Sequence, residues 1–114
     1  LQAAADQFLG THDFAAVRSV GTPVKTTVRT VHHFTVQRRG DLIECRECAN
    51  GFLYNMVRIL TGTLLEVGLG DRSLPEVRLA LEGKDRSLAG FTAPPQGLFL
   101  VDVFYPAAEE ERTL

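Results

Sequence analysis

The sequence contains no tryptophan, one methionine and two cysteines among its 114 residues. Two cysteines are too few for the disulfide framework that stabilises small secreted domains, so a reducing compartment is expected. No apolar run reaches the roughly 18 residues that a membrane-spanning helix needs, and the first residues lack the basic end of a signal peptide. We therefore expect a cytoplasmic protein that has no membrane partner.

The composition is that of one globular domain. Hydrophobic residues make up 45% of the chain and charged residues 23%, which excludes disordered and fibrous classes. The net charge of −2 argues against a nonspecific nucleic-acid binder, but no acidic residue lies between Arg18 and Arg39. This basic stretch is either an anion-facing surface or a set of ordinary solvated positions. The chain starts on Leu1, and we expect it to be a domain of a longer protein.

Hydrophobic spacing predicts the order helix, strand, strand, helix, helix, strand. The predicted elements are a helix at 1–9, a turn or single-turn helix at 11–14, strands at 26–37 and 42–49 around a turn at Gly40, a helix from 51 or 52 to 68 or 70, a helix at 74–82, and a strand at 98–105. Asn50 is the expected cap of the long helix, and Ser73 with Glu76 forms a capping box. Strict alternation puts Val31 and Phe34 on opposite faces of the first strand. This order favours an α+β domain whose mainly antiparallel sheet has helices packed on one face.

The long predicted helix carries one arginine in the middle of its polar side. Its apolar stripe consists of Leu53, Met56, Leu60, Leu64 and Val67. Arg58 lies on the other side with apolar flanking residues, and a guanidinium in such a setting keeps its proton and needs a carboxylate, phosphate or carbonyl acceptor. Either Arg58 holds a catalytic carboxylate or a substrate phosphate, or it is structural, extending to solvent or pairing with Glu66.

Two other patterns have a weaker chemical meaning. Cys45 and Cys48 have the spacing of a zinc or redox motif, but residues three apart on a strand point to opposite faces. We therefore expect ordinary thiols and no metal site. His12 and Asp13 are neighbours in sequence, and neighbours rarely face one substrate.

Several short motifs occur together and in a fixed order over residues 7–106. They are Gly10-Thr-His12-Asp13-Phe14, Thr27-Val-Arg29, Phe52-Leu-Tyr-Asn-Met56-Val57-Arg58 with Gly62, Ala89-Gly90, Thr92-Ala93-Pro94, Gly97-Leu98, and Val103-x-Tyr105-Pro106. In this combination the chain resembles the C-terminal half of the tRNA pseudouridine synthase A family.

The resemblance implies half of a pseudouridine-synthase fold. Residues 1–106 would form its C-terminal domain and residues 107–114 a disordered acidic tail. The implied reaction is the cofactor-free isomerisation of uridine to pseudouridine in the tRNA anticodon stem-loop, at tRNA positions 38–40. The family's nucleophilic aspartate comes from the N-terminal half, and no aspartate of this chain lies in a matching motif. We therefore expect the 114 residues alone to be inactive.

The resemblance also assigns roles to particular residues. Arg58 matches the family's active-site arginine, which pairs with the nucleophilic aspartate, and Gly97 and Leu98 match the segment that lines the base pocket. The expected partners are tRNA, the N-terminal half of the same protein and a second copy in a homodimer.

Three further arginines, Arg29, Arg38 and Arg39, are candidates for contacts with the tRNA backbone, because A-form stems are recognised through phosphates and shape. Two alternatives stay open: a non-catalytic α/β RNA-binding domain, and a dimerisation domain without RNA contact.

Overall fold

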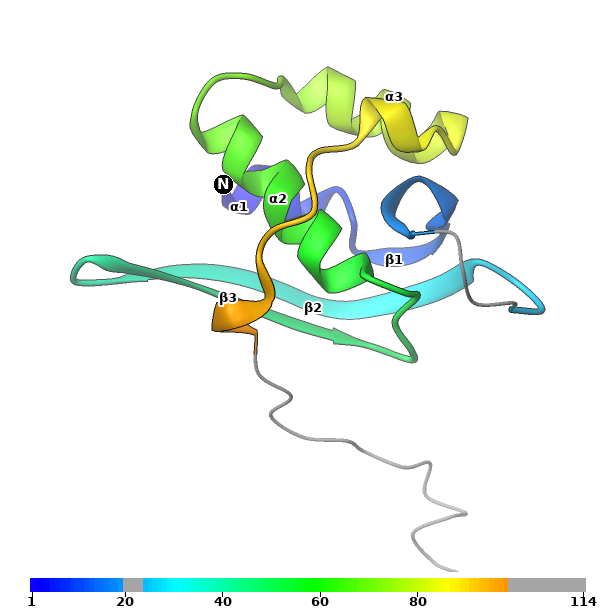
Figure 1. The fold of residues 1–114 in the computed structure, drawn as a ribbon, viewed down its shortest axis with the longest axis horizontal. Helices are drawn as coiled ribbons and strands as arrows, with labels where there is room; N and C mark the ends of the chain where they lie inside the picture. The colour runs from blue at the N-terminus through cyan, green and yellow to red at the C-terminus, as the bar shows by residue number, and fades with distance from the viewer. Residues whose placement is uncertain (20–23, 99–114) are drawn as a thin grey trace, which may run out of the picture.

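The computed structural model describes residues 1–19 and 24–98. Its three strands form one antiparallel sheet in the order β1-β2-β3, with β1 at Gly10–Asp13, β2 at Val28–Arg39 and β3 at Leu42–Ala49. Helices α1 (Gln2–Asp6), α2 (Met56–Gly68) and α3 (Leu74–Gly83) all lie on one face of this sheet (Figure 1). The predicted α+β architecture with helices on one face is therefore confirmed. In the described ranges, none of the helices is long and apolar enough to cross a bilayer.

Strand β1 replaces the turn that the sequence predicted at residues 11–14. It pairs with the start of β2, with Gly10 opposite Val31 and Asp13 opposite Val28. Four residues are too few to show an alternating pattern, so pairing with β2 decides their conformation. The strand predicted at 98–105 lies outside the described residues except for Leu98, as does the predicted tail at 107–114.

The long hairpin forms as predicted, but a bulge changes which side chains face the helices. Gly40 turns the chain with φ of 63°. The pairing with β3 shifts between Val31 and His33, so one extra residue is inserted into β2. As a result Val31 and Phe34 are both buried under the helices, and the prediction that they face opposite sides is wrong.

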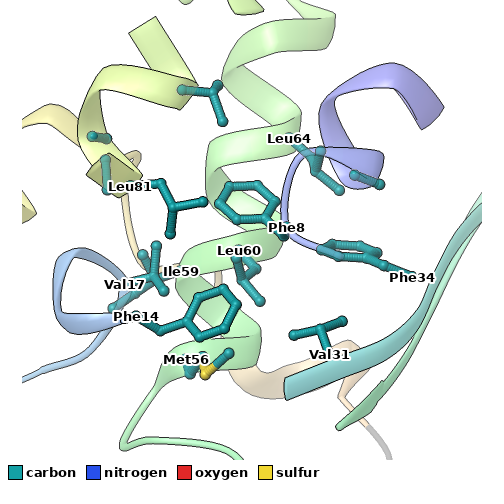
Figure 2. Close-up of a cluster of buried hydrophobic side chains, with 14 of the residues drawn as sticks. Phe8, Phe14, Val17, Val31, Phe34, Met56, Ile59, Leu60, Leu64 and Leu81 are labelled. Atoms are coloured by element: carbon teal, nitrogen blue, oxygen red, sulfur yellow. The ribbon is translucent and has the colours of Figure 1, made fainter. Parts of the chain in front are cut away.

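The core lies between the helices and the sheet (Figure 2). Leu53, Met56, Leu60 and Leu64 are buried as the apolar stripe predicted, and Val67 is partly buried. Ile59 is also fully buried, although its position was expected to flank Arg58 on the polar side. Helix α2 therefore buries a wider face than the predicted stripe, because α3 and the turn at Ala15–Val17 cover it from a second direction.

Helix boundaries differ from prediction where tertiary contacts intervene. Helix α1 ends at Asp6, and α2 begins at Met56 with Asn55 in the cap position. The predicted cap, Asn50, instead bonds to β2: its side-chain oxygen accepts the N–H of Thr30 at 2.9 Å, and its own N–H donates to the Thr30 carbonyl at 3.0 Å. Helix α3 starts as predicted, with its capping box fully formed.

Candidate functional site

Helix α2 begins directly after a residue in the left-handed conformation. Asn55 has φ of 58° and ψ of 11°, a region that asparagine tolerates better than most other side chains. Its carbonyl oxygen accepts the N–H of Ile59 at 2.9 Å, while its side chain makes no capping bond to the helix. The amide of Asn55 is therefore available to other partners at the start of α2.

Arg58 lies in the first turn of α2 and is half-buried. Its Nε donates to the carbonyl oxygen of Ala93 at 2.7 Å, and its Nη1 donates to Oδ1 of Asn55 at 3.1 Å. The backbone N–H of Ala93 in turn donates to the Arg58 carbonyl at 3.0 Å. The alternative pairing with Glu66 is not formed, because Glu66 accepts from Arg72 at 3.0 Å. Arg58 is thus held in place by two neutral acceptors.

An open pocket of about 200 Å³ adjoins Arg58. Its walls are mostly apolar, and the lining residues are Phe52, Leu53, Asn55, Met56, Val57, Arg58 and Leu98. Arg58 supplies the charge in this set and Asn55 the amide. A planar apolar group fits against such walls, and Arg58 can contact an anionic group that is attached to it or lies beside it.

Residues 89–93, called here the crossing segment, run across α2 and place Ala93 beside Arg58. A Cβ atom on Gly62 would lie only 1.8 Å from the carbonyl oxygen of Phe91, so only glycine permits this approach. The N–H of Gly90 donates to Oγ1 of the buried Thr63 at 2.9 Å. At the start of the segment, Arg72 from the loop after α2 donates to the carbonyl of Ala89 at 3.3 Å. The segment is therefore bonded to α2 at Gly90 and Ala93, and to the loop that follows α2 at Ala89.

A second ionisable group is half-buried on the helix-covered side of the sheet. Glu47 lies opposite Phe34 in the β2–β3 pairing, and burial raises the pKa of its carboxyl to about 8. Among the described residues its Oε1 has no hydrogen-bond partner. Burial, and secondly the charge of Glu47, also raise the pKa of the Cys45 thiol. In residues 1–19 and 24–98, no three His, Cys, Asp or Glu side chains gather as a metal site would require.

Comparison with known proteins identifies the family. A family model described as tRNA pseudouridine synthase matches residues 4–106. The chain belongs to this family. Among curated proteins it is 48% identical over 105 residues to the tRNA pseudouridine synthase A of Acetivibrio thermocellus, covering 92% of this chain and 43% of that protein. It is 52% identical over 96 residues to the tRNA pseudouridine synthase A of a Geobacillus strain, covering 84% of this chain and 39% of the relative.

A third relative is the tRNA pseudouridine synthase A of Shouchella clausii, which is 51% identical over 107 residues. The match covers 92% of this chain and 40% of that protein. The chain thus spans about two-fifths of the length of the curated relatives it matches. The resemblance to this family that the sequence motifs indicated is confirmed.

In this member of the tRNA pseudouridine synthase family, the structure brings two of the predicted site residues together. Leu98 lines the same pocket as Arg58, although forty residues separate them in sequence. Gly97 ends the short 3₁₀ helix Pro95–Gly97 directly before Leu98 and is exposed.

The three predicted RNA-contacting arginines do not form one patch. Arg29 is half-buried near the start of β2, where its Nη1 donates to the carbonyls of Thr26 and Val28 at 2.8 and 2.7 Å. Arg38 and Arg39 are exposed at the other end of β2. Arg38 lies nine positions after Arg29 along the strand, which is roughly 30 Å at the usual rise of a strand. Arg39 is further engaged with Glu44, at 3.6 Å between Nε and Oε2.

Sequence reasoning missed the residues that hold Arg58. Asn55 was placed inside the predicted helix, and Ala93 was named only as part of the Thr92-Ala93-Pro94 motif, with no contact to Arg58 expected. The available signal was an asparagine three residues before the arginine, since asparagine tolerates the left-handed conformation better than most other side chains. No local signal points to Ala93, whose contact with Arg58 spans 35 residues.

Proposed function

We propose that this chain is the C-terminal half of a tRNA pseudouridine synthase. The N-terminal half of the same protein supplies an aspartate that attacks the target uridine in the anticodon stem-loop. The uracil then leaves its sugar, turns, and bonds to the sugar through carbon as the bond to the aspartate breaks. That carbon loses its proton, and the ring nitrogen that left the sugar gains one. Arg58 pairs with that aspartate, keeps it ionised and directs its carboxylate. The names of the similar proteins support tRNA as the substrate, and the family's usual homodimer and cytoplasmic location are part of this proposal.

The observation that carries this proposal is the way Arg58 is held beside a pocket. Its two hydrogen bonds go to a carbonyl and an amide oxygen, so neither partner neutralises the guanidinium charge. A guanidinium has more N–H donors than these two bonds use. A carboxylate that approaches the remaining donors gains a charge-assisted, directional contact, and the positive charge lowers its pKa.

The pocket beside Arg58 supports a role in holding the base. Its apolar walls, including Leu98, favour contact with the faces of an extruded uracil, and enzymes that act on a base take it out of the stack. Arg58 stands at the edge of this pocket, where a nucleophilic carboxylate has to meet the sugar attached to the base. Exposed arginines such as Arg38 and Arg39 would contact the tRNA backbone at a distance from it.

The test is turnover by the full-length protein with Arg58→Ala and Arg58→Lys. We expect turnover at saturating tRNA to fall by at least about 100-fold in Arg58→Ala, as when a preorganised donor is removed from an active site. Binding of tRNA should change by no more than about threefold, because the arginine acts on the nucleophile and not on the RNA. Arg58→Lys keeps the charge but not the planar fork, and it should remain strongly impaired.

Arg86 provides a matched control. It is also half-buried, and its Nη1 donates to a carbonyl of the crossing segment, that of Gly90, at 2.8 Å. Arg86→Ala should lower stability and reduce turnover by the folded protein far less than Arg58→Ala does, because Arg86 touches the crossing segment and not the pocket. A proportional loss of tRNA binding in Arg58→Ala would instead indicate a phosphate contact. Pseudouridine formation by the 114 residues alone would contradict the placement of the nucleophile in the other half.

A further inference from the structure

We propose that Asn55 is a positioning residue for Arg58, and that it must be a neutral amide. This inference rests on the proposed function, because it assigns a role to the groups that aim the catalytic arginine. It concerns Asn55 because, in the part of the chain that the structure describes, its amide both lines the pocket and contacts the guanidinium.

The first observation is the backbone of Asn55. Its φ of 58° differs from the extended conformation usual for a helix cap, and it lies in the left-handed region that asparagine tolerates better than most other side chains. The side chain makes no capping bond to α2. The left-handed conformation instead points the amide toward Arg58 and Ser19.

The second observation is that the amide has one possible orientation. A guanidinium only donates hydrogen bonds, so the atom 3.1 Å from Nη1 of Arg58 has to be Oδ1. The Nδ2 group then faces Ser19 and donates to its Oγ at 3.0 Å. Ser19 is itself held by its N–H, which donates to the carbonyl of Tyr54 at 2.9 Å. The bridge therefore ties Arg58 to the segment that follows the turn at Ala15–Val17.

The third observation is that Asn55 and Ala93 hold the guanidinium from two separate parts of the chain. One bond is made by Nε and the other by Nη1, and two fixed nitrogens define the plane and direction of the fork. Among the described residues no carboxylate lies within ion-pair distance of Arg58. The guanidinium of Arg58 is consequently fixed in direction while its charge is not neutralised. An incoming nucleophilic carboxylate requires both.

Because the amide oxygen and the amide nitrogen of Asn55 have different partners, an isosteric substitution tests whether the residue has to be neutral. Asn55→Asp keeps the size, tolerates the left-handed backbone and accepts from both Arg58 and the Ser19 hydroxyl. It also places a competing carboxylate on the guanidinium. We expect the full-length variant to unfold at an equal or higher urea concentration than wild type, yet to lose at least about 30-fold in turnover at saturating tRNA. If Asn55 were purely structural, turnover would not fall in a variant whose stability is equal to or higher than that of the wild type.

Asn55→Gly removes the amide but keeps the backbone conformation, because glycine adopts positive φ without cost. We expect turnover to fall roughly tenfold with the KM for tRNA unchanged. Lys84→Gly is the matched control: within residues 1–19 and 24–98, Lys84 is the other non-glycine residue with positive φ, at 54°, and it lies at the end of α3. It should leave turnover unchanged.

A double substitution separates this inference from the proposed function. If Asn55 acts through Arg58, adding Asn55→Gly to Arg58→Lys should cause less than a twofold further loss in single-turnover rate. A full additional tenfold loss, or wild-type turnover in both Asn55 variants, would overturn the positioning role while leaving Arg58 as the catalytic arginine. Wild-type turnover in Arg58→Lys and Arg58→Ala would overturn the proposed function itself.

Discussion

Gly62 offers the most direct test of how the crossing segment is held against α2. An alanine in the middle of a helix is normally favoured over glycine by up to about 1 kcal/mol. Here, however, the added Cβ would lie 1.8 Å from the carbonyl oxygen of Phe91 and 2.9 Å from its carbonyl carbon. These atoms belong to the backbone, so no side-chain rotation relieves the overlap.

The size of the effect follows from the distance. Reaching an ordinary contact of 3.4 Å requires the crossing segment to retreat by about 1.6 Å. The bond from Gly90 to Thr63 is 2.9 Å long, and those between Ala93 and Arg58 are 2.7 and 3.0 Å, so such a shift breaks two or three of them. At a net value of about 1 kcal/mol each, and after the helix-propensity gain of up to about 1 kcal/mol, Gly62→Ala should lower the free energy of unfolding by about 1–2 kcal/mol.

Urea unfolding followed by circular dichroism measures this change. Gly83→Ala is the matched control, because Gly83 is also helical and a Cβ there meets no atom within 4 Å. It should leave stability unchanged or raise it slightly. In the full-length protein Gly62→Ala should also slow turnover, since the retreating segment carries the Ala93 acceptor away from Arg58. If Gly62→Ala proves as stable as Gly83→Ala, the close crossing is refuted.

Three further predictions concern other parts of the molecule. Glu47 has a pKa of about 8 in the folded chain against an ordinary value of 4.5, so the folded state keeps a proton that the unfolded state has lost between these values. The free energy of unfolding should therefore fall by roughly 2–4 kcal/mol as pH rises from about 5 to 8, and Glu47→Gln should abolish most of that slope in urea titrations. Glu44→Gln is the control. The pKa of the Glu44 carboxyl is lowered, chiefly by a hydrogen bond from the Arg46 side chain, so this substitution should leave the fall of stability between about pH 5 and 8 in place. Ser73→Ala removes the capping box of α3 and should cost about 1 kcal/mol in the same assay. Replacing Arg38 and Arg39 together by Ala should reduce the salt dependence of tRNA binding, measured as the slope of log affinity against log salt, and an unchanged slope would remove them from the RNA interface.

Much of the fold followed from local patterns. The apolar stripe of α2, the hairpin turn at Gly40 and the capping box at Ser73 each depend on residues within a few positions of one another. Such signals survive in any tertiary context, because side-chain periodicity and turn conformation are properties of a short segment. Arg58 was identified in the same way, as a charge that needs an acceptor on an otherwise apolar helix.

The sequence by itself therefore determined the α+β class, the family and the arginine at the centre of the site. The tertiary structure alone decided what surrounds that arginine. Ala93 and Ser19 reach α2 across 35 and 36 residues, the bulge in β2 brings Val31 into the core, and Gly62 matters only because Phe91 crosses above it. These contacts depend on how separate elements pack, and packing geometry is not encoded in the period of any one segment.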